Sequence, residues 1–186
     1  MPTENNKSRK VILFIAQSLD GYIAKLDGNI DFLDNPDRDE SIDHEYDDLM
    51  TNVDTVVMGR TTYDQVVNEL MPDHYPYEQQ QSYILTSHLE PDSSNRHFRT
   101  EPVVELVEQL RTKPGKGIWI IGGSSLIAPL VNANLIDEYV IAVLPTILGG
   151  GIPLFNEQTK ERKLELKSAQ KINDIAYLKY VKKVAQ

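Results

Sequence analysis

The sequence predicts an α/β domain built on a central mixed, mostly parallel sheet flanked by helices. Four short segments rich in β-branched and apolar residues are predicted to be strands, and all but the third along the chain have the hydrophobicity of strands that are covered on both faces. They span residues 11–16, 55–58, 82–86 and 118–121. Helical segments alternate with these strands, and two further strands close the sequence as an antiparallel hairpin around the polar pair Asn173 and Asp174.

The remaining elements follow from the spacing of apolar residues. We predict helices at residues 42–50, 62–70, 102–111 and 125–132, and further strands at residues 138–144, 164–172 and 175–182. The helix at 102–111 has the clearest pattern, because its apolar residues recur at i, i+3, i+4 and i+7 from Val103 onward. Residues 17–41 and 87–100 are expected to be mostly irregular, with a short strand near His97.

One domain accounts for nearly the whole chain. Its 186 residues are enough for one domain with a substantial hydrophobic core but too few for two such domains. Residues 1–9 are polar and lack the apolar segment of a signal peptide. We therefore predict a flexible N-terminal tail over residues 1–9 and a single domain over residues 10–186.

Composition excludes several classes of function. The formal net charge of -9 argues against nucleic-acid binding, which needs positive charge to displace counterions from phosphates. No apolar run approaches the roughly 20 residues needed to cross a bilayer, so no membrane partner is expected. The chain has no cysteine, which excludes disulfides and thiolate chemistry and fits a cytoplasmic location. Its four histidines show no metal-ligand spacing, and no metal site is predicted.

The first segment with chemical character joins the strand at 55–58 to the helix that follows it. The strand ends at Gly59, which lets a ligand approach the backbone, and Arg60, Thr61 and Thr62 come next. A helix N-terminus offers unpaired N–H groups and a partial positive charge, and arginine adds a charged fork for phosphate oxygens. The segment is thus a candidate phosphate site; a simple glycine turn with a threonine cap is the alternative.

A second junction repeats this pattern. The strand at 118–121 runs into Gly122 and Gly123, and Ser124 and Ser125 place hydroxyl groups at the start of the next helix. The segment lacks the G-x-G-x-x-G spacing of a Rossmann fold. Two such junctions in one small domain suit a dinucleotide, because its pyrophosphate needs donors from more than one side.

Asp20, Tyr75 and Tyr77 are the candidates for the substrate side of such a site. Asp20 follows the first strand in a loop beside Gly21, where its carboxylate can orient a substrate or help deliver a proton. An Asp-Gly pair that only forms a turn is the alternative. Tyr75 and Tyr77 either line a substrate mouth or pack within a loop.

Four motifs, each present once, are spread over nearly the whole chain, from Lys10 to Lys182. They are Ser18-Leu19-Asp20-Gly21 with Ile23-Ala24, then Gly59-Arg60-Thr61-Thr62-Tyr63, then Gly122-Gly123, and last the segment from Leu148 to Phe155. In this order they resemble the dihydrofolate-reductase-like superfamily. Within it, the chain resembles a stand-alone bacterial form of the riboflavin-biosynthesis reductase domain, the RibD C-terminal domain.

The resemblance implies a dihydrofolate-reductase-like fold that binds NADPH across the carboxyl edge of its sheet. By position, Ala16 and Ile23 would border the nicotinamide, and Thr86, Ser87 and His88 would hold the adenosine ribose and its 2′-phosphate. The residues contacting phosphates and nicotinamide would be Gly59, Arg60, Thr61, Thr62, Ile121, Gly122, Gly123, Ser124 and Ser125. The implied reaction is hydride transfer from NADPH to a C=N or C=O carbon of a small pteridine-like, flavin-precursor-like or carbonyl substrate. The resemblance also allows a homodimer.

Departures from the family pattern leave the substrate open. A cysteine-free chain cannot hold the zinc deaminase to which such reductases are usually fused. Asp64 is followed by Gln65 and two valines, where these reductases carry an Asp-Asn-Pro–Leu–Arg pattern. Folate reductases place a carboxylate on the first helix; Asp43 and Asp47 lie in that region, but a solvated acidic face is the favoured interpretation. A non-catalytic nucleotide-binding homologue and a true dihydrofolate reductase are therefore the alternatives.

Overall fold

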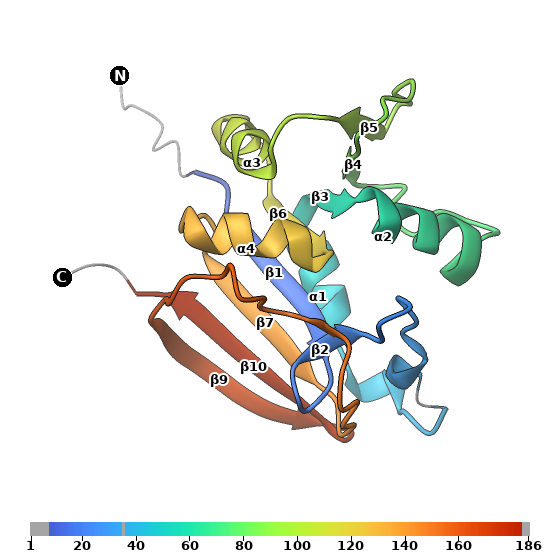
Figure 1. The fold of residues 1–186 in the computed structure, drawn as a ribbon, viewed down its shortest axis with the longest axis vertical. Coiled ribbons are helices and arrows are strands. Elements are labelled where there is room, and N and C mark those ends of the chain that lie inside the picture. The colour runs from blue at the N-terminus through green and yellow to red at the C-terminus, as the bar shows by residue number, and fades with distance from the viewer. Residues whose placement is uncertain (1–7, 35, 184–186) are drawn as a thin grey trace.

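An eight-stranded sheet forms the centre of the computed structural model, which describes residues 8–34 and 36–183 (Figure 1). Its strands pair in parallel in the order β5 (Arg96–Arg99), β4 (Gln81–Leu85), β3 (Val53–Gly59), β6 (Gly117–Gly122), β1 (Val11–Gln17) and β7 (Glu138–Val143). The hairpin of β10 (Ile175–Lys182) and β9 (Leu164–Ile172) continues the sheet antiparallel beyond β7. A second, two-stranded sheet pairs β2 (Tyr22–Ala24) with β8 (Ile152–Pro153). The predicted mixed sheet and C-terminal hairpin are confirmed.

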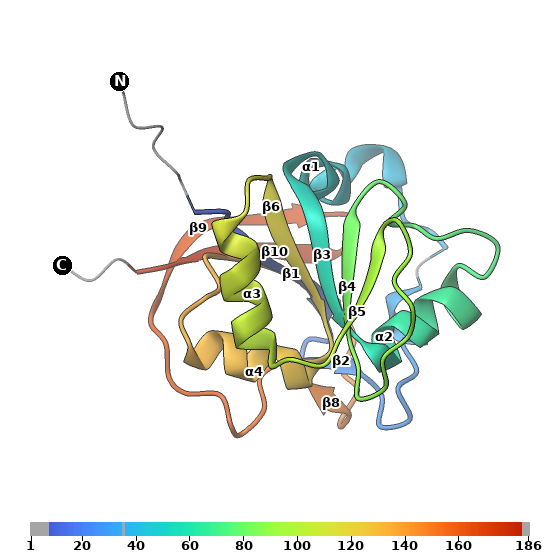
Figure 2. The same cartoon turned by 90° about the horizontal axis from the view of Figure 1, so that it is seen from above.

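Helices cover both faces of the sheet (Figure 2). On one face lie α3 (Val103–Thr112) and α4 (Ser124–Asn132), and on the other lie α1 (Glu45–Asn52), α2 (Arg60–Gln65) and the π-helical turn η3 (Val66–Leu70). Two 3₁₀ turns, η1 (Asp31–Leu33) and η2 (Glu40–Ile42), interrupt the long connection from β2 to α1. None of the helices in the described part of the chain has the length and hydrophobicity needed to cross a membrane.

Each face of the sheet has its own core. On the α3 face, Leu110 and the strand residue Ile120 belong to one buried cluster, and both are at most 1% exposed. On the opposite face the core is aromatic, and the rings of Trp119 and Tyr77 meet edge to face at 5.6 Å. The Trp119 ring N–H donates to the Phe14 carbonyl at 3.0 Å, so its polar group is satisfied in the core. The central strands are therefore covered on both faces, as their unbroken hydrophobicity predicts.

The observed helices and strands differ from the predicted ones at two helix starts and at two very short strands. α1 begins at Glu45 rather than at residue 42, because Ile42 ends a 3₁₀ turn and the Asp43 carboxylate accepts a hydrogen bond from the Glu45 N–H. α2 begins at Arg60, directly after β3 and earlier than predicted. The sequence does not predict β2 and β8, since strands this short have no hydrophobic periodicity to detect.

Arg9 belongs to the folded domain, which corrects the predicted tail over residues 1–9. It is 7% exposed, forms an ion pair with Asp54 and donates to the Thr55 hydroxyl at 2.6 Å. A buried guanidinium needs such partners because an unpaired charge is costly to remove from water. Residues 1–7 of the predicted tail lie outside the described residues.

Candidate functional site

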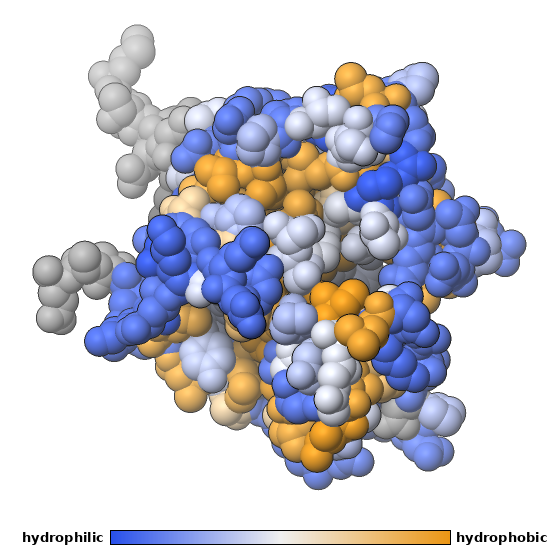
Figure 3. Space-filling view, viewed as in Figure 1, coloured by the Kyte–Doolittle hydropathy of each residue, from blue (hydrophilic) through white to orange (hydrophobic). Residues whose placement is uncertain are grey.

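A large pocket lies along the carboxyl edge of the parallel strands, from β5 at one end to β1 at the other. Its volume is about 1410 Å³, whereas a pocket for one drug-sized ligand has roughly 300–1,000 Å³. The surface is hollowed near its centre in the space-filling view, and hydrophobic residues border the hollow (Figure 3). Open α/β sheets bind ligands at this edge, and this pocket has room for a dinucleotide and a second small molecule.

The two predicted strand–glycine–helix junctions lie side by side in this pocket. β3 and β6 are neighbours in the sheet, and Met58 pairs with Gly122. A Cβ atom added to Gly59 would lie 3.9 Å from the backbone nitrogen of Gly123. Gly122 has a φ of +132°, which residues with side chains rarely adopt, and its peptide bond to Gly123 is cis. The glycines therefore keep the floor of the pocket free of side chains.

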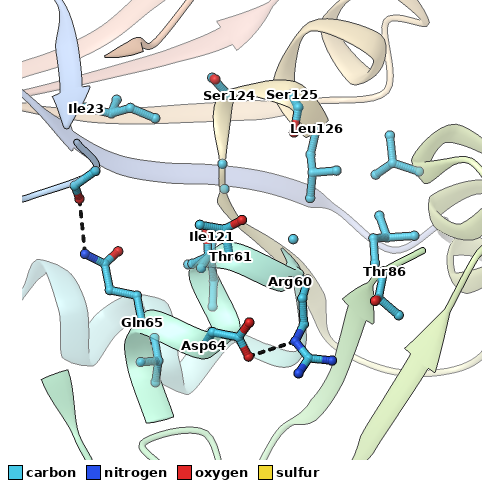
Figure 4. A pocket seen from close by; sticks show the side chains of 18 of the residues that line it. Ile23, Arg60, Thr61, Asp64, Gln65, Thr86, Ile121, Ser124, Ser125 and Leu126 are labelled. Atoms are coloured by element: carbon cyan, nitrogen blue, oxygen red, sulfur yellow. Dashed lines mark hydrogen bonds and ion pairs between the residues drawn. The ribbon is translucent and has the colours of Figure 1, made fainter. Parts of the chain in front are cut away.

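The helices that follow these junctions begin at the pocket without a side-chain cap. Gly59 precedes α2 and Gly123 precedes α4, and a glycine has no side chain to bond the first N–H groups of a helix. Hydroxyl groups of Thr61, Ser124 and Ser125 lie beside these helix starts (Figure 4). Backbone donors, hydroxyls and the partial positive charge of a helix N-terminus together suit a phosphate group.

All the residues predicted to contact a cofactor line this pocket. They are Ala16, Ile23, Gly59, Arg60, Thr61, Thr62, Thr86, Ser87, His88, Ile121, Gly122, Gly123, Ser124 and Ser125. Figure 4 shows Ile23 at one end of the pocket, Arg60 and Thr86 at the other, and Ile121 between them. The fold thus brings together segments from β1, β2, β4 and the two junctions, and their contact with a cofactor stays a prediction.

Asp20, the predicted catalytic residue, does not line the pocket. Its carboxylate accepts hydrogen bonds from the Ser18 hydroxyl at 2.7 Å and from the N–H groups of Leu148 at 3.1 Å and Gly149 at 2.7 Å. The bond from Ser18, aided by these two N–H groups, lowers the pKa of Asp20 to about 2. A group with this pKa is ionised at neutral pH and has no proton to donate. Asp20 therefore joins two loops through its carboxylate, and its catalytic role stays a prediction.

The loops that Asp20 joins carry residues into the pocket. Ile23 of β2 and Ile152 of β8 both line it, and these two strands pair with each other. Gly151 lies directly against β2, because a Cβ atom there would be 2.3 Å from the Ala24 carbonyl oxygen. Only glycine fits this close approach of two backbones. The small β2–β8 sheet is thus a wall of the pocket.

Arg60 is held by carboxylates at the β4–β5 end of the pocket. Its Nε lies 2.7 Å from Asp64, and a terminal nitrogen forms an ion pair with Glu90. Glu90, and after it Asp64, raise the pKa of Arg60. The guanidinium also lies 6.0 Å from the ring centres of Tyr63 and Phe98. Arg60 is therefore positioned at the pocket, and a ligand phosphate would compete with Glu90 for it.

The same end of the pocket holds a second arginine, Arg99, which is not among the residues predicted from the sequence. Arg99 ends β5, lines the pocket, and binds both carboxylate oxygens of Asp92 at 3.0 and 2.9 Å. Nearby, the His88 N–H donates to the Thr86 hydroxyl at 3.1 Å, and the Ser87 hydroxyl lies 2.9 Å from the His88 ring. The position of Arg99 at the end of a strand parallel to β4 is the signal that could have revealed it.

The opposite end of the pocket, near β1, is apolar. Ile30, Leu33, Val66, Leu70 and Tyr77 line it together with the predicted residues of β1 and β2. Of these five residues, only Tyr77 is a candidate from the sequence. Ile30 and Leu33 come from a stretch without periodicity, so no local pattern could assign them to a pocket.

Asp43 is buried but does not line the pocket. Its side chain is 5% exposed, forms an ion pair with Arg38 and accepts a hydrogen bond from the Tyr177 hydroxyl at 2.7 Å. The interpretation of Asp43 as part of a solvated acidic face is therefore wrong, whereas Asp47 is exposed as expected. Within the described part of the chain, no group of three or more potential ligand side chains could hold a metal ion.

Fold and site together define an α/β protein with a large pocket at the edge of its sheet. Glycines line the centre of this pocket, and one of its ends is apolar. The family model for the RibD C-terminal domain matches residues 9–177, and the chain belongs to this family. Its fold is dihydrofolate-reductase-like, as in the solved relatives described next.

Two relatives come from Bacillus subtilis (strain 168), and both are uncharacterized. The protein YwjB is 40% identical over 177 residues, which cover 94% of this chain and 98% of YwjB. The protein YyaP is 29% identical over 163 residues, which cover 82% of this chain and 84% of YyaP. These relatives share the length of this chain but carry no assigned activity.

This chain is also similar to several proteins of solved structure. A protein from Shewanella sp. PV-4, described as a riboflavin biosynthesis protein, has a TM-score of 0.79 and 30% identity, covering 94% of this chain and 99% of that one. A pyrimidine reductase-like protein from Corynebacterium diphtheriae has a TM-score of 0.70 and 14% identity, over 97% and 94% of the two chains. A deaminase/5-amino-6-(5-phosphoribosylamino)uracil reductase from Thermotoga maritima has a TM-score of 0.68 and 14% identity, over 95% of this chain and 57% of that one.

Proposed function

We propose that this chain is an NADPH-dependent reductase that transfers a hydride to a C=N or C=O group of a small substrate. The observation that carries the proposal is the pair of adjacent junctions at Gly59 and Gly122 on the floor of the large pocket. Membership of the RibD C-terminal domain family, whose solved relatives include a reductase by description, supports the same reaction class.

The residues present fit a dinucleotide. The two uncapped helix starts follow Gly59 and Gly123, which lie close together on adjacent strands, and this suits a pyrophosphate with donors from two helices. Thr86, Ser87 and His88 offer hydroxyl and ring donors at the end of β4 for a ribose and its phosphate. When bound, NADPH would supply the hydride.

The protein's part in this reaction is to bind, orient and exclude water. Ala16 and Ile121 present apolar surface beside the glycine floor, and Ile23 and Ile152 form the wall above it. Such surface holds reacting groups in contact and keeps water from them, which favours hydride transfer. Asp20 acts on the site indirectly, through the loop that carries β8.

The preference for NADPH over NADH depends on Arg60 at the polar end. Two arginines line this end, Arg60 and Arg99, beside the carboxylates of Asp64, Glu90 and Glu101. A 2′-phosphate brings charge that can replace Glu90 as the partner of Arg60, whereas the free hydroxyl of NADH cannot. We therefore expect NADPH to bind more tightly than NADH.

Titration of both cofactors, followed by quenching of protein fluorescence, tests the proposal. Tighter binding of NADPH supports it, and equal affinities would remove the 2′-phosphate assignment. Absence of binding by either cofactor would overturn the proposed function. NADPH binding without oxidation by any carbonyl or imine would favour the non-catalytic homologue.

A true dihydrofolate reductase is disfavoured by the position of Asp43. That role needs a carboxylate facing the substrate, but Asp43 is paired with Arg38 and Tyr177 away from the pocket lining. The direct check is NADPH oxidation in the presence of dihydrofolate, which we expect to be negligible.

A further inference from the structure

We propose that the substrate of this reductase is an uncharged, largely apolar carbonyl or imine compound that carries no phosphate or carboxylate group. The inference rests on the proposed function, because it assigns the part of the pocket left beside the cofactor. It names a substrate class that differs from the phosphoribosylaminouracil in the description of the Thermotoga maritima relative.

Charge is unevenly distributed along the pocket. Among the described residues, every charged lining residue, and the one lining histidine, lies in three segments, 60–64, 86–90 and 99–101. These segments lie at the carboxyl ends of β3, β4 and β5. The lining contributed by β6, β1, β2 and the loops near them has no lysine, arginine, histidine, aspartate or glutamate in the described part of the chain. The pocket therefore has a polar end for the cofactor and an uncharged end.

The uncharged end is also apolar. Its side chains are those of Ile23, Ile30, Leu33, Val66, Leu70 and Tyr77. The one side-chain amide there, that of Gln65, already donates to the Gly28 carbonyl at 3.2 Å. Burial of Tyr77 raises the pKa of its hydroxyl, so this group is neutral at physiological pH.

The two cations of the loop beside this end are paired with carboxylates of the same loop and lie outside the pocket lining. Lys25 forms an ion pair with Asp31, and Arg38 forms one with Asp43. Neither Lys25 nor Arg38 lines the pocket. A phosphate or carboxylate placed at this end would lose its water without gaining a partner, which is strongly unfavourable. An apolar molecule would instead gain from burial against the aliphatic side chains.

The reaction balances without an ionisable side chain at this end. The C=O or C=N π bond of the substrate breaks as its carbon gains a hydride from the reduced nicotinamide, which becomes NADP⁺. The oxygen or nitrogen of the substrate gains a proton from a water molecule of the solvent, which leaves as hydroxide. The product is an alcohol or an amine.

Binding of a matched pair of aldehydes to the NADP⁺-loaded protein tests the substrate class without turnover. The probes are methyl 4-formylbenzoate, which is neutral, and 4-formylbenzoate, which has the same aldehyde and one negative charge. Isothermal titration calorimetry should give the neutral ester an affinity about tenfold or more above that of the anion. NADPH oxidation with the same pair should show the same order of kcat/KM.

Two lysine variants and a matched control test whether the preference for the neutral ester arises at the apolar end of the pocket. Ile30→Lys and Leu70→Lys each add a cation to the apolar end, and Leu70 is 49% exposed, so its replacement does not disturb the core. Leu26→Lys adds the same charge in the same loop as Ile30 at a site that is 84% exposed and outside the lining. The first two should reduce the preference for the neutral ester about tenfold, and the control should leave it unchanged.

The outcomes separate this inference from the proposed function. If NADP⁺ and NADPH do not bind, the proposed function fails. If they bind but the anionic aldehyde binds as well as the ester, or neither aldehyde binds, the substrate class is wrong and the cofactor assignment stands. Equal effects of Leu26→Lys and Leu70→Lys would likewise show that the preference does not arise at the apolar end.

Discussion

The Asp20 carboxylate lies 2.7 Å from the backbone nitrogen of Gly149 and accepts a hydrogen bond from it. The contact joins the loop after β1 to the loop before β8, which are far apart in the sequence. Since β2 and β8 carry Ile23 and Ile152 into the pocket, an exposed carboxylate helps to set the shape of the site. We propose from this contact that Asp20 positions the wall of the pocket.

Replacing Asp20 with Asn should loosen the loop before β8. The amide has one accepting oxygen and one donating nitrogen, so the N–H of Gly149 or the donors of Ser18 and Leu148 would lose their acceptor. We expect faster hydrogen exchange at the Gly149 amide together with lower turnover. Unchanged exchange with a large loss of turnover would instead restore the proton-transfer role.

The same contact should persist to unusually low pH. The pKa of Asp20 is about 2 in the folded protein, below its ordinary value of 3.8. Its stabilising effect is therefore fully present above about pH 4 and is lost as the pH falls through about 2. The amide chemical shift of Gly149, followed by NMR, should titrate with a midpoint near pH 2. A midpoint near 4 would show that the carboxylate is not held by these donors.

Replacing Arg60 with Ala should weaken NADPH binding without unfolding the domain. Loss of a charge-assisted phosphate contact corresponds to a roughly ten- to hundredfold rise in Kd. Arg96→Ala is the matched control, because Arg96 is a nearby arginine that does not line the pocket. Titration with NADPH and thermal denaturation of both variants distinguish a binding role of Arg60 from a structural one. A lower melting temperature with normal NADPH affinity would show that Arg60 has a structural role only.

Replacing Glu90 with Gln should have the opposite effect. The change removes the competing partner of Arg60 and one negative charge from the polar end, so NADPH should bind several-fold more tightly. The gain should be smaller for NADH, which lacks the 2′-phosphate. Glu105→Gln, at an exposed position of α3, controls for the change in net charge. Weaker NADPH binding would mean that Glu90 orients Arg60 productively.

Replacing Tyr177 with Phe should destabilise the fold without changing cofactor affinity. Its hydroxyl donates to Asp43 and accepts a hydrogen bond from Arg38 at 2.9 Å, which ties the loop before α1 to β10. Losing these bonds should lower the free energy of unfolding by about 1–3 kcal/mol. Tyr180→Phe, on the same strand, should cost less, because its hydroxyl forms no hydrogen bond among the described residues. Denaturant titration of the two variants provides the measurement, and equal stabilities would contradict the assignment.

Local patterns in the sequence determine much of this protein. The apolar spacing of α3 and the mainly apolar, β-branched sequences of β1, β3, β4 and β6 suffice to predict a mixed sheet between helices. The Gly59 and Gly122 junctions can also be recognised in the sequence. A glycine between the end of a strand and the start of a helix indicates a place where a ligand can approach the backbone. The residues of both junctions line one pocket, together with the residues that the family resemblance assigns to the cofactor.

Only the tertiary structure decided which partner each polar side chain has. Asp20 meets Gly149, Arg60 meets Glu90, and Asp43 turns inward to Tyr177, although nothing near these residues in the sequence specifies the pairing. The apolar end of the pocket has the same origin, since its residues come from irregular loops and a π-helical turn. The reason is physical: secondary structure follows from the chemistry of neighbouring residues, whereas a pocket wall or an ion pair depends on how distant loops dock on the sheet.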